Sequence, residues 1–259
     1  MDHYLSTDLW RQTVEEHSIR LGEPSEDNVR IIALSQLHEE AACREYLSWL
    51  QEYIGAPDMR VAASMLAKRI GYLWIAPLLT AMTVHHQHVS FRLDNSFLYH
   101  PTLTANEGGT HFPFLAMNGL RAEALTGDRE VWREKVVKEM FALHLAPLLK
   151  TLAAIAPLSM SILWENIMIR IVPLYTPEVD NAEQESQHII QADFSYLTQG
   201  APGHLFGVKR NPFTRFTKNK DSIPAVKSKR TTCCFYYQMS GEYCRKCPKI
   251  DNENKSQLK

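Results

Sequence analysis

Four cysteines near the carboxyl end form the most reactive group of side chains in this chain. Cys233 and Cys234 are adjacent and Cys244 and Cys247 follow, so that four of the five cysteines lie within fifteen positions of a 259-residue sequence. A chain of this length can bury a core without disulfides, and its first residues lack the basic and apolar regions of a secretory signal. We therefore expect reduced thiols, and a group this dense predicts a metal or redox site.

The spacing of these thiols is compatible with more than one kind of centre. Cys244 and Cys247 form a CxxC knuckle, in which two sulfurs one turn apart can reach the same metal. Cys233 and Cys234 are less usual, because neighbours on an ordinary strand point to opposite faces. A zinc ion commonly takes two knuckles, whereas a two-iron, two-sulfide cluster accepts more varied spacing. Spacing alone leaves open an iron-sulfur cluster, a zinc ion and a redox-active dithiol that acts as a switch.

The residues around the cysteines resemble the FhuF-type ferric siderophore reductases. The matching runs are RTTCCFYY at residues 230–237 and CRKCP at residues 244–248, with a shorter similarity in LWEN at residues 163–166. The terminal position of the motif and the size of the preceding body also agree with that family. Nine residues separate Cys234 from Cys244, one fewer than in the family's pattern.

This resemblance implies a cytoplasmic iron-sulfur oxidoreductase. Its [2Fe-2S] cluster, held by Cys233, Cys234, Cys244 and Cys247, would pass one electron to siderophore-bound Fe(III) and release Fe(II). The implied partners are a ferric siderophore and an electron donor such as a flavodoxin, a ferredoxin or a flavin reductase, with no nucleic acid and no transmembrane segment. The alternative is a siderophore-binding or iron-handling accessory protein in which the four cysteines hold a structural zinc ion.

Charged and polar residues elsewhere are candidates for substrate contacts. Residues 206–250 hold eleven Lys and Arg against two acidic residues, an excess that could steer an anionic iron complex or an acidic donor, and Arg210 and Arg230 belong to it. His86, His88 and Arg92 share the polar face of a predicted strand and could line a substrate pocket or simply be exposed. We expect the iron complex to dock between these two regions.

Glu165 and Asn166 interrupt an otherwise apolar run, and burial would oblige them to find hydrogen-bond partners. They could belong to a ligand site or brace a helix. The aromatic residues Phe235, Tyr236 and Tyr237 could likewise shield a metal centre or anchor the cysteine loop to the body, with a short hairpin turning at Gly241.

The pattern of apolar residues predicts a mainly α fold with short antiparallel β-hairpins. Two helices are expected between residues 5 and 53, with Cys43 on an apolar face of the second. Asp58 is expected to cap a helix that bends or ends at Pro77, and Asp128 to cap one that continues through or around Pro147. Further helices are predicted at residues 159–172 and 181–197.

A two-residue period between residues 83 and 99 predicts strand structure with a hairpin turn at Asp94 and Asn95, followed by an irregular segment at residues 100–119. These elements suggest four parts of the chain. Residues 1–205 form a helical, reductase-like body, 206–229 a basic connector, 230–250 the [2Fe-2S]-binding unit and 251–259 a disordered tail.

Overall fold

The computed structural model describes residues 13–102, 111–175, 184–217 and 229–250, which form a mainly helical protein with short strands, as predicted. The strands are β1 (Ile19–Leu21), β2 (Arg30–Ala33), β3 (Gln87–Ser90), β4 (Ser96–His100), β5 (Phe114–Met117) and β6 (Arg121–Ala124). The α-helices are α2 (Glu40–Tyr53), α3 (Met59–Ile70), α4 (Ala76–Thr83), α5 (Arg129–Lys138), α6 (Ala146–Ile155), α7 (Met160–Ile171), α8 (Gln184–Ser195) and α9 (Tyr237–Ser240). No helix within these ranges is both long and apolar enough to span a membrane.

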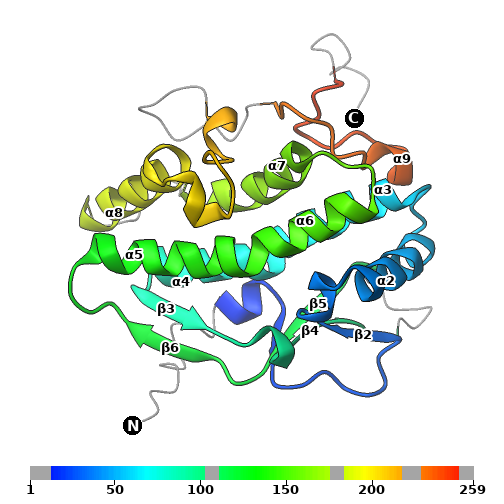
Figure 1. The fold of residues 1–259 in the computed structure, drawn as a ribbon, viewed down its shortest axis with the longest axis horizontal. Coiled ribbons are helices and arrows are strands. Elements are labelled where there is room, and N and C mark those ends of the chain that lie inside the picture. The colour runs from blue at the N-terminus through cyan, green and yellow to red at the C-terminus, as the bar shows by residue number, and fades with distance from the viewer. Residues whose placement is uncertain (1–12, 103–110, 176–183, 218–228, 251–259) are drawn as a thin grey trace.

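Two long helical rods form the centre of the molecule (Figure 1). One rod joins α3 to α4 through the π-helical turn η2 (Gly71–Ile75), and the other joins α5 to α6 through the π-helical turn η4 (Glu139–Leu145). In this view α7 and α8 lie above the rods and the strands lie below them. The segment that carries the four cysteines lies at the upper right, beside α9 and the ends of α3 and α7.

Each of these two π-helical turns is followed by an alanine and then a proline. The Ala76 N–H bonds to Gly71 O before Pro77, and the Ala146 N–H bonds to Phe141 O before Pro147. Proline lacks an N–H and its ring clashes with the preceding helical turn, so a wider turn at this point lets the rod continue. Pro77 therefore does not end its helix, and Pro147 is accommodated in the way that the sequence predicted.

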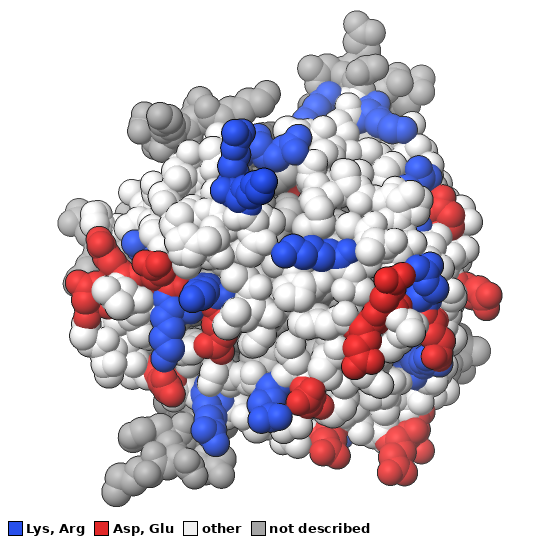
Figure 2. All heavy atoms as spheres, viewed as in Figure 1, with Lys and Arg blue, Asp and Glu red and all other residues white. Residues whose placement is uncertain are grey.

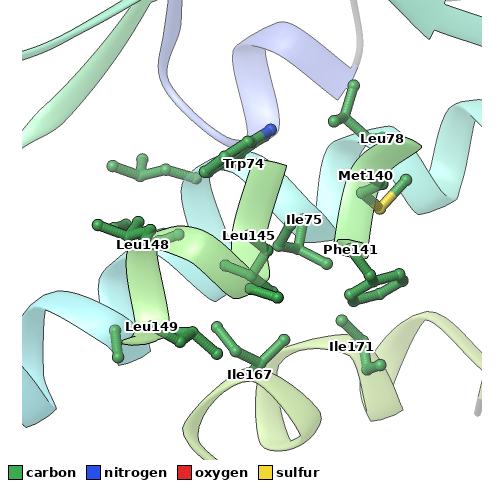
Figure 3. Close-up of a cluster of buried hydrophobic side chains, with 14 of the residues drawn as sticks. Trp74, Ile75, Leu78, Met140, Phe141, Leu145, Leu148, Leu149, Ile167 and Ile171 are labelled. Carbon is green, nitrogen blue, oxygen red and sulfur yellow. The ribbon is translucent and has the colours of Figure 1, made fainter. Parts of the chain in front are cut away.

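The core lies where the two rods meet α7 (Figure 3). Ile75 of η2, Leu145 of η4 and Ile167 of α7 point toward one another, while Trp74 of η2 lies on the other side of the rods, and all four are almost completely buried. Asp58 caps α3 by accepting a hydrogen bond from Val61 N, as predicted. Burial of these large apolar side chains is the main source of stability and places α3 firmly against α7.

The observed strands contradict two predictions made from the sequence. Two helices were expected between residues 5 and 53, and α2 forms part of the second, but the segment before α2 holds β1 and β2, which join the four-stranded sheet β1-β5-β4-β2. The expected hairpin at Asp94 and Asn95 is also wrong, since β3 pairs with β6 and β4 pairs with β2 and β5. The turn between them leads from one sheet to the other, and β5 occupies part of the segment that was expected to be irregular. Their pairing partners lie far along the chain, beyond the reach of a local pattern.

The proposed connector does not begin at residue 206. Phe206 and Phe213 are fully buried, with the ring of Phe141 at 5.1 Å and 5.7 Å from theirs respectively. Residues 206–213 thus complete the helical core, and the change in charge along the chain does not mark a boundary in packing. The later part of the proposed connector, residues 218–228, and the proposed tail, residues 251–259, lie outside the described residues.

Candidate metal centre

The four clustered cysteines lie in a loop that packs on the outer ends of α2 and α3. Cys234 is buried against Ala56, Val61, Ala62 and Met65, which form a small hydrophobic cluster separate from the main core. Cys247 is also buried, whereas Cys233 and Cys244 are partly exposed. The loop is therefore packed on the helical body, with thiols at the boundary between body and solvent.

The backbone brings together thiols that an ordinary strand would separate. Phe235 adopts a left-handed conformation with φ of +64°, and its N–H donates a hydrogen bond of 3.4 Å to Cys233 Sγ. After this reversal α9 forms a single turn, which ends at Gly241 with φ of +75°, in place of the hairpin that was predicted. The chain then returns, so that Cys244 Sγ lies 3.8 Å from Cys234 Sγ.

The sulfur spacing fits two ligands of one metal. Two thiolates bound to a tetrahedral ion by bonds of about 2.3 Å lie about 3.8 Å apart. The hydrogen bond between these two thiols lowers the pKa of Cys234 and raises the pKa of Cys244. Burial raises the pKa of Cys233.

No group of three or more His, Cys, Asp or Glu side chains within the described ranges is placed to surround a single metal ion. A zinc ion would take four such ligands around one point. A [2Fe-2S] cluster presents two metal atoms, each of which takes two thiolates. Four thiols in one loop, two of them 3.8 Å apart, supply the donor set of either centre.

One buried and two half-buried cations lie near the Cys234 and Cys244 pair. Lys68 of α3, Arg170 of α7 and Arg230 each interact electrostatically with Cys234. Burial lowers the pKa values of Lys68 and Arg170, while the negative charge of Cys234 opposes that change. Positive charges in a poorly solvated setting favour thiolates and any further negative charge placed on a group bound to them.

A buried carboxylate holds the start of the cysteine loop. Glu165 of α7 is 3% exposed, and its two oxygens accept hydrogen bonds from Thr231 N at 2.6 Å and Thr232 N at 2.7 Å. Both threonine hydroxyl groups also donate to this carboxylate. Hydrogen bonds to a charged acceptor are strong, so Glu165 positions the two residues directly before Cys233.

Asn166 extends this network to the other side of the loop. Its Oδ1 accepts a hydrogen bond of 2.6 Å from Arg230 Nη2, and its Nδ2 donates to the backbone oxygen and hydroxyl of Ser64. The Ser64 hydroxyl then donates to Cys234 O at 2.9 Å. Among the described residues, Arg230 Nη1 is buried without a hydrogen-bond partner, so a donor close to the thiols is still free.

The aromatic residues between the cysteine pairs anchor the loop through cations of α3. The guanidinium of Arg60 lies 4.6 Å from the Phe235 ring centre, and Lys68 Nζ lies 5.2 Å from that of Tyr236. Arg60 also donates to Gln238 Oε1. Cation-π contacts of this kind contribute about 0.5–2 kcal/mol each, so the anchoring interpretation of these aromatic residues is supported by direct contacts.

The five candidate substrate residues do not converge on one site. Arg230 is at the cysteine loop, whereas Arg210 is exposed and Arg92 is an exposed partner of Asp94. His86 lies before β3 in a left-handed conformation, and Arg129 Nη1 is 3.4 Å from its Nδ1. His88 is buried, with Nε2 3.1 Å from Glu139 Oε2. The shared polar face expected for the two histidines is wrong, because His86 lies outside the strand and His88 points inward.

Sequence reasoning missed three residues that contact or face the cysteine loop: Ser64, Lys68 and Arg170. A signal for two of them was present, since Ser64 and Lys68 are polar residues four positions apart in an otherwise largely apolar helix and so share one face.

Comparison of the chain with models of known protein families and with curated protein sequences gave no match.

Proposed function

We propose that this protein is a ferric siderophore reductase whose cofactor is a [2Fe-2S] cluster held by Cys233, Cys234, Cys244 and Cys247. The observation that carries the proposal is the 3.8 Å approach of Cys234 Sγ and Cys244 Sγ beside three cations. The similarity of this loop to the FhuF-type reductases supplies the reaction. When bound, the cluster would accept one electron from a donor protein and give one electron to Fe(III).

The similarity of the loop to the FhuF-type reductases favours iron-sulfur over zinc as the occupant. Four thiols in one loop supply the donor set of such a cluster. The cations Lys68, Arg170 and Arg230 would offset the negative charge of four thiolates and of an added electron.

The chain's own residues would position the reacting groups without acting as acid, base or nucleophile. Glu165 and Asn166 hold residues 230–232, and Ser64 holds the backbone at Cys234, so the loop keeps one conformation. The oxygen ligands of a siderophore are hard donors that favour Fe(III). A one-electron reduction to Fe(II) is therefore sufficient to weaken binding and release the metal.

The partners follow from this chemistry. The electron must come from a one-electron carrier such as a flavodoxin, a ferredoxin or a flavin reductase, and the oxidant is the ferric siderophore. The five free cysteines agree with a reducing compartment, and we place the protein in the cytoplasm. Several Lys and Arg side chains lie along the top of the face seen in Figure 2, some of them where Figure 1 shows the cysteine loop, and most of the acidic side chains visible on this face lie lower. This charge distribution would attract an anionic or acidic partner.

Anaerobic purification tests the proposal directly. The expected protein is red-brown, contains two iron and two sulfide per chain, and loses its visible absorption on addition of dithionite. The reduced protein should then recover its colour when an iron(III) trihydroxamate is added, while a ferrous chelator captures one Fe(II) per chain. A colourless protein with one zinc per chain would instead identify the accessory protein with a structural zinc site.

A further inference from the structure

A small cavity lies between α7 and the cysteine loop. Its volume is about 40 Å³, enough for roughly two or three water molecules or one carboxylate group. The lining residues are Glu165, Met168, Ile169, Val172, Phe216, Lys229, Arg230, Thr231 and Lys246. The cavity is too small for a whole iron chelate, so it can take only one arm of such a molecule.

One side of this cavity is cationic. This side is formed by Lys229 and Arg230 at the start of the cysteine loop and by Lys246 within it. The backbone N–H of Arg230 donates a hydrogen bond of 2.9 Å to Lys246 O. Lys246 lies inside the CxxC knuckle, next to Cys247. A group bound in the cavity would therefore lie beside the cysteine unit.

In the described part of the chain, no acidic side chain forms an ion pair with Lys246. Lys246 is half-buried, and its ammonium forms no ion pair or hydrogen bond with the described residues. Glu165 is the one acidic residue among those that line the cavity, and its oxygens are already taken by Thr231 and Thr232. A half-buried ammonium without a partner is stabilised by binding an anion.

The opposite side is apolar. Met168, Ile169 and Val172 come from α7 and the turn that follows it, and Phe216 completes the wall. A ligand that combines a carboxylate with a short aliphatic stem would match both sides. Its carboxylate would form an ion pair with Lys246, and its stem would pack against the apolar wall. A bare inorganic anion would leave that wall without a complementary surface.

We propose that this cavity binds a carboxylate arm of the iron(III) chelate and so holds the metal beside the cysteine unit. The proposal rests on the reductase function and specifies its substrate class as chelates that carry a free carboxylate. An acidic side chain of the electron donor could present the same chemical group. The position of the cavity between α7 and the cysteine loop, and its volume of about 40 Å³ with an apolar wall, favour the small molecule.

Binding of gallium(III) citrate to the full-length cluster-loaded protein tests the proposal, because gallium has the charge of Fe(III) but is not reduced. Calorimetry should show that Lys246→Gln weakens binding at least about tenfold, that Lys246→Glu weakens it further and that Lys246→Arg retains it. Lys249→Gln is the matched control, since Lys249 is an exposed lysine of the same loop that does not line the cavity. Binding of a neutral gallium(III) trihydroxamate should be the same in all four variants.

The outcomes separate this inference from the reductase function. Unchanged affinity for gallium(III) citrate in both Lys246→Gln and Lys246→Glu would overturn the carboxylate site even if the protein reduces iron. Affinity that depends on Lys246 in a protein that reduces no iron(III) chelate would support the site and refute the reductase. If Lys246→Gln leaves citrate affinity unchanged but slows reduction by flavodoxin, the cavity receives the donor and the proposal is overturned.

Discussion

Asn166 Oδ1 accepts a hydrogen bond of 2.6 Å from Arg230 Nη2, which joins α7 to the residue that begins the cysteine motif 64 positions later. Both side chains are almost completely buried. Arg230 also donates to Thr232 O and lies 3.5 Å from Glu165 Oε2. One buried guanidinium thus connects the helical body, the threonines and the charge around Cys234.

Removal of the Asn166 amide should loosen the cysteine loop. Asn166→Leu keeps a similar volume but leaves Arg230 and Ser64 without their partner, and we expect a loss of about 2–3 kcal/mol in the free energy of unfolding. Hydrogen exchange at residues 230–247 should accelerate more than exchange in α5, because the loop loses its anchor first. Urea unfolding and exchange measured by mass spectrometry provide the check.

Ser161→Ala is the control for this change, because Ser161 lies at the start of the same helix and accepts only a hydrogen bond from exposed Arg215. It should alter stability by less than about 0.5 kcal/mol. Equal exchange rates in the cysteine loop of Asn166→Leu and the unmodified protein would contradict an anchoring role for Asn166.

Loss of Cys244 should abolish cluster binding. Cys244→Ser removes one member of the 3.8 Å sulfur pair, and we expect iron and sulfide contents near zero after anaerobic reconstitution, together with loss of Fe(II) release. Metal analysis and the visible spectrum measure the effect. The matched control is Cys43→Ala, since Cys43 is fully buried in the main core and burial raises its pKa to about 12. This control should keep its iron, and loss of iron from it would argue against assignment of the cofactor to the four clustered cysteines alone.

Acid should destabilise the fold partly through His100. Burial lowers the pKa of this side chain to about 4, below the ordinary value of about 6.5 expected in the unfolded chain. The unfolded state therefore binds more protons between these values. The contribution of His100 to the free energy of unfolding is fully present above about pH 6.5. It is lost as the pH falls toward 4, and the loss reaches about 3 kcal/mol.

His100→Gln tests that pH dependence, because glutamine can still accept the hydrogen bond from the Tyr46 hydroxyl but does not titrate. The variant should lose about 3 kcal/mol less than the unmodified protein between pH 7 and pH 4 in urea unfolding followed by tryptophan fluorescence. His204→Gln, at a mostly exposed position, should follow the unmodified protein. The same pH slope in all three proteins would refute the role of His100.

A second buried network, at the other end of the molecule, should affect stability without affecting the metal site. Asp193 is fully buried and accepts hydrogen bonds from Arg129 at 2.7 Å, Arg133 at 3.0 Å and Thr83 at 3.0 Å. Asp193→Asn leaves two arginines without their anion and should cost about 3–5 kcal/mol. Unfolding by urea at low temperature measures that cost, and the folded fraction should retain a full complement of iron. A variant with native stability, or a stable one that lacks iron, would contradict this separation.

Local patterns in the chain predicted a large part of this structure. The caps at Asp58 and Asp128, the apolar face around Cys43 and the helix over residues 159–172 all depend on residues three or four positions apart. The strands were predicted less well. The period around β3 was recognised, but its partner β6 lies more than thirty residues later, so the expected local hairpin was wrong.

The candidate site was likewise predicted only in part from local sequence patterns. The types and spacing of Cys233, Cys234, Cys244 and Cys247 were enough to predict a metal-binding loop, because thiol chemistry is a property of the residues themselves. The roles of Glu165 and Asn166 were left open, since a polar residue in an apolar helix can brace the helix or bind a ligand. Only the packing of α7 against the loop brought Glu165 to Thr231, 66 positions away, and Lys68 close to Cys234. Contacts of that range form when burial of the core places whole helices side by side, and no local pattern contains them.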